Sequence, residues 1–354
     1  MTRWGIWARC AVTASSCGVI TALAGCSAGT DAVPASVQTR TPSATASPGE
    51  GTGATAGPGG SGGSAGVSGS VAPLTGLSVT AAIAQRPAVA VAVSGSDPVG
   101  LGFADLVLQE MAGPVRYLAV FQSAEASAVG PVTSTRPTDG QALSVLHPLT
   151  SYDGGTTAFI SVLDATKIVD YGYARHASLY SGGSGGPTVS TAALAAAGRS
   201  DGPPPELFGY RLPGDSLATA DETHPTSVRV EAPGEPAEQW NFDARTDRWV
   251  QTAGGPPVSV ANLVVQIVSF KTVYISRKLN QTAHSALFTG KGAVTVFSGT
   301  AAGGSGGTGA AGSWSKPGIA AVTNYFDAAG QPMSFEPGPT WVVLAPAGTH
   351  LAGG

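Results

Sequence analysis

The sequence predicts an α+β protein with two folded parts: an N-terminal domain built on a mixed sheet with flanking helices, and a smaller C-terminal domain rich in antiparallel β-strands. Two observations lead to this prediction. Segments with strand and helix character alternate through residues 73–222, which is typical of a sheet with helices packed against it. From residue 227 onward the apolar segments have strand composition only, and turn residues separate them.

The N-terminal domain, residues 73–222, begins with the clearest strand signal. Ala88–Val93 alternates alanine and valine, as expected of a strand covered on both faces. The apolar residues from Phe103 onward lie at helical spacing and end at a Gly-Pro pair, which stops a helix. Residues 181–187 are expected to form a flexible loop. The other expected elements are strands at 115–122, 129–133, 148–153 and 167–170, and helices at 103–111, 137–146, 156–165 and 191–197.

The C-terminal domain, residues 223–346, is expected to consist of hairpins. Residues 285–288 and 293–297 are expected to pair with each other, and the Gly/Ala-rich insert 299–312 is expected to be a disordered loop. Residues 347–354 are assigned as a tail. The remaining expected elements are a hairpin at 240–250 and strands at 263–268, 314–316, 324–326, 332–335 and 341–344.

Four tryptophans of this domain stand out in a chain that is otherwise poor in aromatic residues. They are Trp240, Trp249, Trp314 and Trp341. Tryptophans usually fill the core of a small sheet domain, and that is the interpretation we favour. A platform for binding sugars is the alternative.

The first 25 residues have the features of a secretion signal. Arg3 and Arg9 precede a mostly apolar stretch that ends in Leu-Ala-Gly followed by Cys26. Small residues before a cysteine resemble a bacterial lipobox, so we expect residues 1–25 to be a signal peptide and Cys26 to be acylated. An uncleaved membrane anchor is the alternative. In either case the rest of the chain faces outward. With the lipid, the protein is expected on the outer face of the bacterial cytoplasmic membrane, with the membrane as a partner through the N-terminal lipid.

The segment 26–72 consists almost entirely of Ala, Gly, Ser, Thr and Pro. Such a segment buries too little apolar surface to offset the conformational entropy that it would lose on ordering. We therefore expect a disordered tether with an r.m.s. reach of about 35–40 Å. Its expected role is that of a spacer.

Composition and charge exclude several classes of function. Of the 354 residues only 11% are charged, and the formal net charge is −4. No basic run occurs outside the leader, so nucleic-acid binding is not expected. The three cysteines, Cys10, Cys17 and Cys26, leave the rest of the chain without thiols for a disulfide or a zinc site. We expect no metal and no cofactor.

A series of short motifs resembles a known family. The series is Pro-Leu-Thr-Gly-Leu at 73–77, Arg86-Pro87, Arg116 in a strand ending Ala-Val-Phe-Gln, Gly130-Pro131-Val132 and Arg136-Pro137. Over roughly residues 73–346 it is similar to the YerB-like bacterial lipoproteins. This resemblance implies a compact α+β N-terminal domain, a smaller C-terminal domain and no established activity.

The chain departs from that family at several polar positions. Thr133 stands where members commonly have an arginine, and Asp153 stands where they often have a histidine. Arg175 and His176 begin a segment in which members tend to have Pro-His-Asn. These departures weaken any inherited catalytic role.

Two arginines are the first candidates for ligand binding. Arg116 and Arg136 could each present the planar fork of a guanidinium to a carboxylate or phosphate. The alternative is a structural ion pair with one of three nearby acids, Asp105, Glu110 or Asp139.

A second group of candidates lies between residues 153 and 176. Asp153, Arg175 and His176 are candidate binding residues, and Asp153 with Asp170 is a candidate carboxylate pair of the glycosidase type. Gly-x-Ser-x-Gly occurs three times, but always inside Gly/Ser repeats, so it does not indicate a serine hydrolase.

The expected function is that of a lipid-anchored extracytoplasmic protein without enzymatic activity. It would bind a cell-envelope polymer or an envelope protein, with Arg136, Asp153 and the surroundings of Arg175 as the contact region. A cell-wall or glycan hydrolase that uses Asp153 and Asp170 is the alternative.

Overall fold

The computed structural model describes residues 69–354 except 167, 184, 199–201, 213–214, 277 and 301–303. The expected signal peptide, the acylated Cys26 and nearly all of the expected tether lie outside the described residues. Among the described residues no helix is long and apolar enough to cross a membrane.

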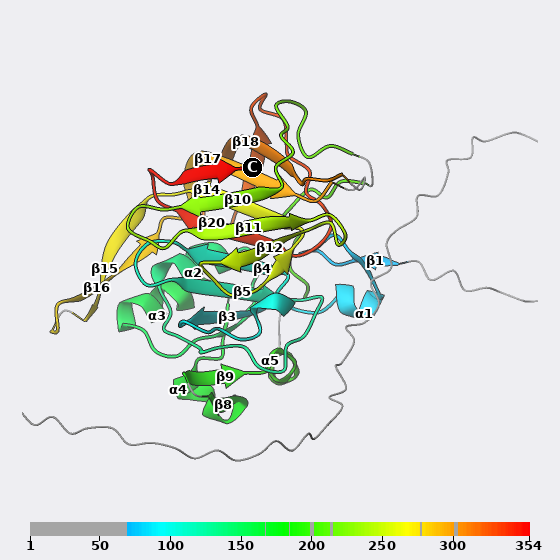
Figure 1. The fold of residues 1–354 in the computed structure, drawn as a ribbon. Coiled ribbons are helices and arrows are strands. Elements are labelled where there is room, and N and C mark those ends of the chain that lie inside the picture. Colours follow the sequence, from blue (N-terminus) through cyan, green and yellow to red (C-terminus); the bar gives the residue numbers. More distant parts are fainter. Residues whose placement is uncertain are drawn as a thin grey trace, which may run out of the picture. The chain divides into compact units, whose positions relative to one another are not determined.

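A mixed sheet of ten strands forms the centre of the fold (Figure 1). Its first five strands come from the C-terminal half of the chain and its last five from the N-terminal half. Strand β20 joins the halves, because it pairs in parallel with β14 on one side and with β4 on the other. Across the sheet the strands are β19 (Asn324–Asp327), β18 (Thr308–Lys316), β17 (Gly290–Ser298), β14 (Asn262–Ile267), β20 (Thr340–Ala345), β4 (Leu106–Glu110), β5 (Arg116–Phe121), β3 (Val89–Ser94), β6 (Leu149–Ser151) and β7 (Val169–Asp170).

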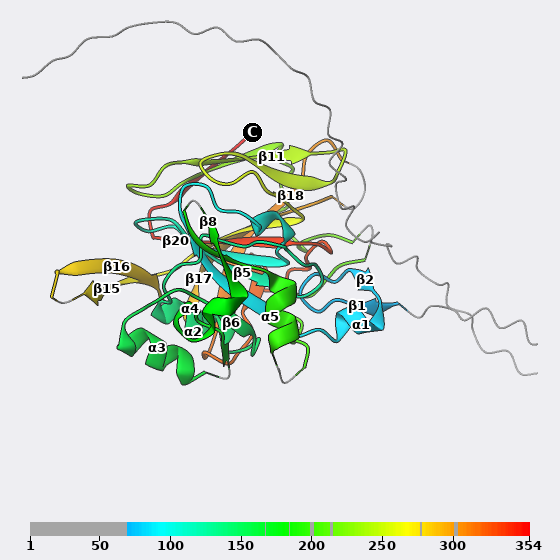
Figure 2. The same ribbon diagram turned by 90° about the horizontal axis from the view of Figure 1, so that it is seen from below.

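A second, antiparallel sheet of five strands covers one face of the central sheet, while helices α2 and α3 lie on the other face (Figure 2). This arrangement confirms the α+β class. The strands of the second sheet, in order, are β13 (Ser259–Val260), β12 (Arg248–Ala253), β11 (Glu238–Asp243), β10 (Ser227–Glu231) and β21 (His350–Gly353). The residues assigned as a tail therefore contain an edge strand of this sheet.

The alternation in β3 explains how one strand serves both faces. Its valines, including Val91, belong to the core cluster that holds Trp240 and Trp249 of the five-stranded sheet. Its alanines, including Ala90, belong to the cluster that holds Leu143 of α2. Successive side chains of a strand point to opposite faces, so the small residues meet the helices and the larger ones meet the second sheet.

The helices begin where the sequence places their caps. In α2 (Pro137–Leu143), proline occupies the first turn and the carboxylate of Asp139 accepts a hydrogen bond from the Arg136 backbone N–H. In α3 (Thr157–Asp164) and α5 (Thr191–Ala197), the hydroxyls of Thr156 and Ser190 cap the first turn. The short helices are α1 (Ala81–Ala84) and α4 (Tyr173–His176), and the 3₁₀ turns are η1 (Leu101–Phe103) and η2 (Ala177–Leu179).

Several expected elements differ in the structure. The helix expected at 103–111 is strand β4, because its apolar residues are buried on both faces and pair with β5 and β20. The flexible loop expected at 181–187 is a hairpin of β8 (Tyr180–Gly183) and β9 (Gly186–Val189). The strand expected at 129–133 makes only isolated bridges.

Two further differences lie in the C-terminal half. Residues 285–288 do not pair with 293–297. Instead β16 (Gln281–Ala286) pairs with β15 (Phe270–Ser276) as a separate two-stranded arm. The insert expected to be disordered at 299–312 contains the first part of β18, which pairs with β17 along its whole length.

The four tryptophans lie in the core, as the favoured interpretation held. Their exposed fractions are 0% for Trp240, Trp249 and Trp341 and 2% for Trp314. Trp240 and Trp341 meet edge to face with ring centroids 5.7 Å apart. A platform for sugars needs an exposed ring face, so these side chains do not provide one.

The described residues begin with a short strand pair. Strand β1 (Ser70–Val71) pairs with β2 (Ser78–Val79), and Ala72 and Leu74 between them are fully buried. Ordered pairing therefore starts within the last residues of the segment expected to be a tether.

Candidate functional site

The first candidate arginine, Arg116, is enclosed in the protein. Its Nη1 and Nη2 atoms donate to the two carboxylate oxygens of Asp139 at 2.7 and 2.5 Å, and Nη2 also donates to the Ser134 carbonyl at 3.1 Å. The exposed fractions of the two side chains are 2% and 1%. Burial alone would lower the pKa of Arg116, but the charges of Asp139 and Glu110 outweigh it and raise that pKa. This geometry is the structural ion pair of the alternative interpretation.

The second candidate, Arg136, connects the two halves of the chain. Its Nη1 lies 3.2 Å from Glu110 Oε2 and donates to the His284 carbonyl of β16 at 3.0 Å. The other oxygen of Glu110 accepts a hydrogen bond from the Ala286 backbone N–H at 3.2 Å. Burial and the nearby charge of Arg116 lower the pKa of Arg136. The two arginines, with Glu110 and Asp139, thus form a buried network that holds the root of the β15–β16 arm.

Two of the candidates from 153 to 176, Asp153 and Asp170, lie near the side chain of Tyr180. Burial is the main cause that raises the pKa of Tyr180 to about 12, and the negative charges of Asp153 and Asp170 add to it. Asp170 Oδ1 accepts from the Gly172 backbone N–H at 2.7 Å, and its other oxygen pairs with Arg175. The structure therefore brings Asp153, Asp170 and Arg175 into one neighbourhood.

His176 has a packing contact in this neighbourhood. Its ring lies 4.6 Å from that of Tyr171. Among the residues that the structure describes, no cluster of His, Cys, Asp and Glu could hold a metal ion.

Two cavities that have Arg211 in common lie elsewhere in the fold. The Arg248 pocket has a volume of about 390 Å³ and is lined chiefly by Leu77, Tyr210, Arg211, Asp247, Arg248 and Glu336. The His224 pocket has a volume of about 500 Å³ and is lined chiefly by Arg211, Asp215, Glu222, His224, Thr300 and Thr308. Arg211 belongs to the walls of both.

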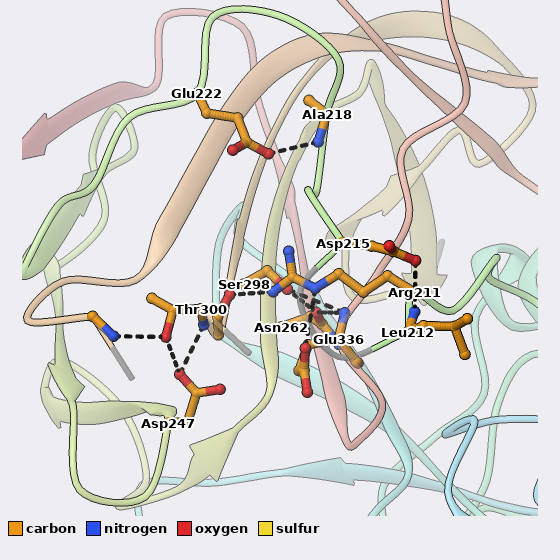
Figure 3. Close-up of polar contacts among 12 residues, drawn as sticks. Arg211, Leu212, Asp215, Ala218, Glu222, Asp247, Asn262, Ser298, Thr300 and Glu336 are labelled. Carbon is orange, nitrogen blue, oxygen red and sulfur yellow. Dashed lines mark hydrogen bonds and ion pairs between the residues drawn. The ribbon is translucent and has the colours of Figure 1, made fainter. Parts of the chain in front are cut away.

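Arg211 is held firmly in the wall between the pockets. Only 3% of it is exposed, its Nε donates to Glu336 Oε2 at 3.0 Å, and its Nη2 donates to the Gly299 carbonyl. The Glu336 backbone N–H in turn donates to Asn262 Oδ1 at 3.1 Å and to Ser298 Oγ at 3.2 Å (Figure 3). These bonds hold Arg211 in place through its Nε and Nη2 atoms.

Arg248 differs from Arg211 because its guanidinium lacks such partners. Among the described residues its side chain makes no hydrogen bond and no ion pair. Burial lowers its pKa, and the charges of Glu336 and Asp247 offset this only in part. A Cβ atom placed on Gly338 would lie 2.8 Å from Arg248 Nη1, so the bare backbone there makes room for the guanidinium.

Asp247 is itself anchored beside this arginine. Its Oδ1 accepts hydrogen bonds from the Thr300 backbone N–H at 2.7 Å and from the Thr300 hydroxyl at 3.0 Å. The backbone of Asp247 has a φ of 55°, which is a conformation that aspartate tolerates better than most residues. The turn that carries Arg248 is therefore fixed. Its side chain lines a cavity large enough for a sugar, a short peptide segment or a phosphate group.

Sequence reasoning missed this site. Arg211 and Arg248 belong to no motif, and residues 206–224 read as a connection between domains. One signal was available: the chain has no Asp or Glu between Arg248 and Asp327, so Arg248 opens a long segment without acidic residues. The closeness of Arg248 to Gly338 and Glu336 depends on folding.

Comparison with known proteins identifies the family but no activity. Residues 74–184 match the N-terminal domain, and residues 228–342 the C-terminal domain, of a protein family of unknown function, DUF3048. A search of curated proteins found no match. The crystal structure of the YerB protein from Bacillus subtilis is similar, with a TM-score of 0.63 and 18% identity, over 80% of this chain and 99% of that chain. The chain therefore belongs to the two-domain, YerB-like DUF3048 family of unknown function.

Proposed function

We propose that this protein is a non-enzymatic binding protein of the bacterial envelope, and that the Arg248 pocket holds an acidic group of an envelope polymer. A lipid on Cys26 would keep the protein on the outer face of the cytoplasmic membrane. The observation that carries the proposal is the Arg248 guanidinium, which lines a cavity of about 390 Å³ without a hydrogen-bond partner among the described residues.

An acidic group is the ligand chemistry that fits Arg248 best. The Arg248 side chain is half-buried, and a partly desolvated cation without a protein partner is stabilised by a ligand that supplies two acceptor oxygens. The neighbouring cation, Arg211, already shares its charge with Glu336. Carboxylates of wall peptides and phosphates of wall polymers both present the planar or trigonal oxygens that a guanidinium fork accepts.

Acidic residues near Arg248 limit how strongly the pocket attracts an acidic ligand. Asp247 and Glu336 lie near Arg248 and weaken its positive potential. The ligand would therefore bind through close, directional hydrogen bonds rather than through long-range attraction, and a polymer would gain affinity from repeated weak contacts. The His224 pocket, on the other side of Arg211, offers room for the next unit of such a polymer.

The arginines at 116 and 136 are less suited to this role because both are engaged inside the protein. Arg175 and Asp153 form a second contact in this proposal, since the side chain of Arg175 is 61% exposed. The hydrolase alternative is less favoured, because Asp170 is already bound to Arg175 and to the Gly172 backbone.

The pocket is tested by the variant Arg248→Gln in the full chain. We expect its affinity for purified peptidoglycan with attached wall polymers to fall by about 10- to 100-fold, since a charge-assisted bond to a half-buried guanidinium is lost. Arg229→Gln is the matched control. Arg229 is also an arginine on a strand, but half of its side chain is exposed. Equal binding by both variants and the wild type, measured by co-sedimentation, would exclude the pocket as the site.

The anchor is tested separately with Cys26→Ala. We expect this variant to incorporate no labelled palmitate and to leave the membrane fraction or remain unprocessed. Palmitate still attached to the variant would contradict the proposed anchor without affecting the proposal for the pocket.

A further inference from the structure

The β15–β16 arm is a separate two-stranded ribbon that projects from the body of the protein. Figures 1 and 2, which view it from two directions, both show it extending beyond the helices and the central sheet. Its strands pair only with each other, from Phe270 opposite Ala286 to Ser276 opposite Gln281. The tip of the ribbon therefore has no covering layer among the described residues.

The tip carries large apolar side chains in contact with solvent. The exposed fractions are 44% for Tyr274, 41% for Ile275 and 66% for Leu279. Leu279 has the largest exposed fraction of the large hydrophobic residues that the structure describes. Its backbone N–H donates to Ser276 Oγ at 3.2 Å, which holds the turn and keeps Leu279 at its outer end.

The arm is basic in a chain that is acidic overall. Lys278 lies exposed beside Leu279, and Arg277 precedes it in the sequence. No Asp or Glu occurs between Arg248 and Asp327, whereas the whole chain has a formal net charge of −4. The segment that contains the arm therefore supplies no acidic residue to offset this charge.

The root of the arm is rigidly attached. Arg136 donates to the His284 carbonyl at 3.0 Å, and Thr138 Oγ1 lies 2.8 Å from Ser285 Oγ. The Ala286 N–H is held by Glu110 at 3.2 Å. The buried arginine network thus fixes the direction in which the tip is presented.

These features together favour a lipid surface as the partner that the tip of the arm contacts. An apolar tip that also carries an aromatic residue and a cation has the composition of segments that enter the headgroup region of anionic membranes. The three apolar side chains expose on the order of 300 Å² together, well below the roughly 800 Å² that each partner contributes to a stable protein interface. Attachment to a bilayer, in contrast, requires only a few inserted side chains.

We propose that the tip of the β15–β16 arm, formed by Tyr274, Ile275 and Leu279 with Lys278, inserts into the headgroup region of an anionic lipid bilayer. This contact would be a second attachment to the membrane, independent of the lipid on Cys26, and would orient the Arg248 pocket relative to the membrane. The proposal for the arm rests on the proposed function in one respect only, namely that the protein is held at a membrane.

The test is hydrogen–deuterium exchange of the full chain carrying Cys26→Ala, with and without vesicles. We expect vesicles of phosphatidylglycerol to slow exchange at 272–282, and vesicles of phosphatidylcholine to have no effect. Residues 240–250, which form a hairpin in the five-stranded sheet, are the internal reference and should exchange at the same rate throughout. Equal protection by both lipids, or protection by neither, would overturn the proposal.

Two sets of variants assign the contact to the tip. Ile275→Ser with Leu279→Ser should weaken flotation with phosphatidylglycerol vesicles by about tenfold or more, and Lys278→Gln by about fivefold. Ile319→Ser, at a residue that is 47% exposed outside the arm, is the matched control and should bind as the wild type does. Tip variants that float like the wild type would also overturn the proposal.

Arg248→Gln separates the two proposals. This variant should lose polymer binding but keep the protection of residues 272–282 by vesicles. A protein that fails on vesicles and still binds wall polymer through Arg248 would leave the proposed function standing and remove only the lipid contact of the arm.

Discussion

Two pairs of arginines illustrate different uses of a buried cation. Arg116 and Arg136 lie at the contact between the central sheet, helix α2 and the arm, and each is paired with a carboxylate. Arg211 and Arg248 lie at the edge of the sheets beside two cavities, and only Arg211 is paired. Arg116 and Arg211 are buried, Arg136 and Arg248 are half-buried, and Arg248 is the one of the four without an ion pair among the described residues.

The difference indicates which of these arginines can bind a ligand without first losing a bond inside the protein. Where Asp139 takes both Nη atoms of Arg116, a ligand would have to break a buried pair before it could bind. Where Arg248 has no hydrogen-bond partner, a ligand adds bonds and breaks none. Burial therefore does not identify a ligand-binding arginine by itself, and the state of its partners does.

The largest effect is expected from breaking the buried pair of Arg116 with Asp139. Asp139→Asn should lower the free energy of unfolding by about 3–5 kcal/mol, because it leaves the charge of Arg116 buried and uncompensated. Urea unfolding followed by tryptophan fluorescence measures this change. Glu231→Gln, which removes the carboxylate from the exposed pair with Arg229, is the matched control and should cost less than about 1 kcal/mol. Equal losses in the two variants would show that the network is not a structural element.

A buried carboxylate without a cation sharpens the comparison. Glu238 is 1% exposed and accepts hydrogen bonds from Gln109 and from Trp240 Nε1, while Trp341 Nε1 donates to Gln109 at 2.7 Å. All these partners are neutral. Burial therefore dominates and raises the pKa of Glu238 to about 7. Asp139, in contrast, faces the positive charge of Arg116.

Stability should consequently depend on pH through Glu238. Between pH 4.5 and about 7 the folded protein keeps the proton on Glu238, whereas the unfolded chain releases it. The free energy of unfolding should fall as the pH rises through this window, by roughly 3 kcal/mol in all. Asp105, whose burial raises its pKa to about 6, contributes in the same direction. The measurement is therefore the difference between the wild type and Glu238→Gln, whose profile should be flatter by that amount. Parallel profiles would contradict the raised pKa.

How far the sequence predicts this fold depends on the range of the interactions. Local signals succeed: the caps of α3 and α5 are found where the sequence places them. The alternation in β3 also gives a strand covered on both faces. Strand β4 shows the limit, because its residues fit helical spacing as well as a buried strand, and only its pairing with β20, far along the chain, decides between them.

The candidate site is less predictable for the same reason. Sequence motifs single out Arg116 and Arg136 as candidates. They do not show that Arg116 pairs with Asp139 and Arg136 with Glu110 in the folded protein. Arg248 belongs to no motif. Its surroundings come from separate segments of the chain, which contribute Leu77, Tyr210, Ala261 and Glu336 in addition to the turn at Asp247.

The smallest effect on stability is expected from Arg248 itself, and this expectation separates binding from folding. Arg248→Gln removes a cation whose pKa is lowered by burial and whose guanidinium makes no hydrogen bond among the described residues. The free energy of unfolding should therefore change by less than about 1 kcal/mol, as for a substitution that disrupts no network. Urea unfolding under the conditions used for Asp139→Asn measures it. A loss above about 2 kcal/mol would place Arg248 with the structural arginines, and weaker polymer binding by the variant would then be explained by damage to the fold. A small change together with a 10- to 100-fold loss of binding is the combination expected of an arginine that the fold keeps available for a ligand.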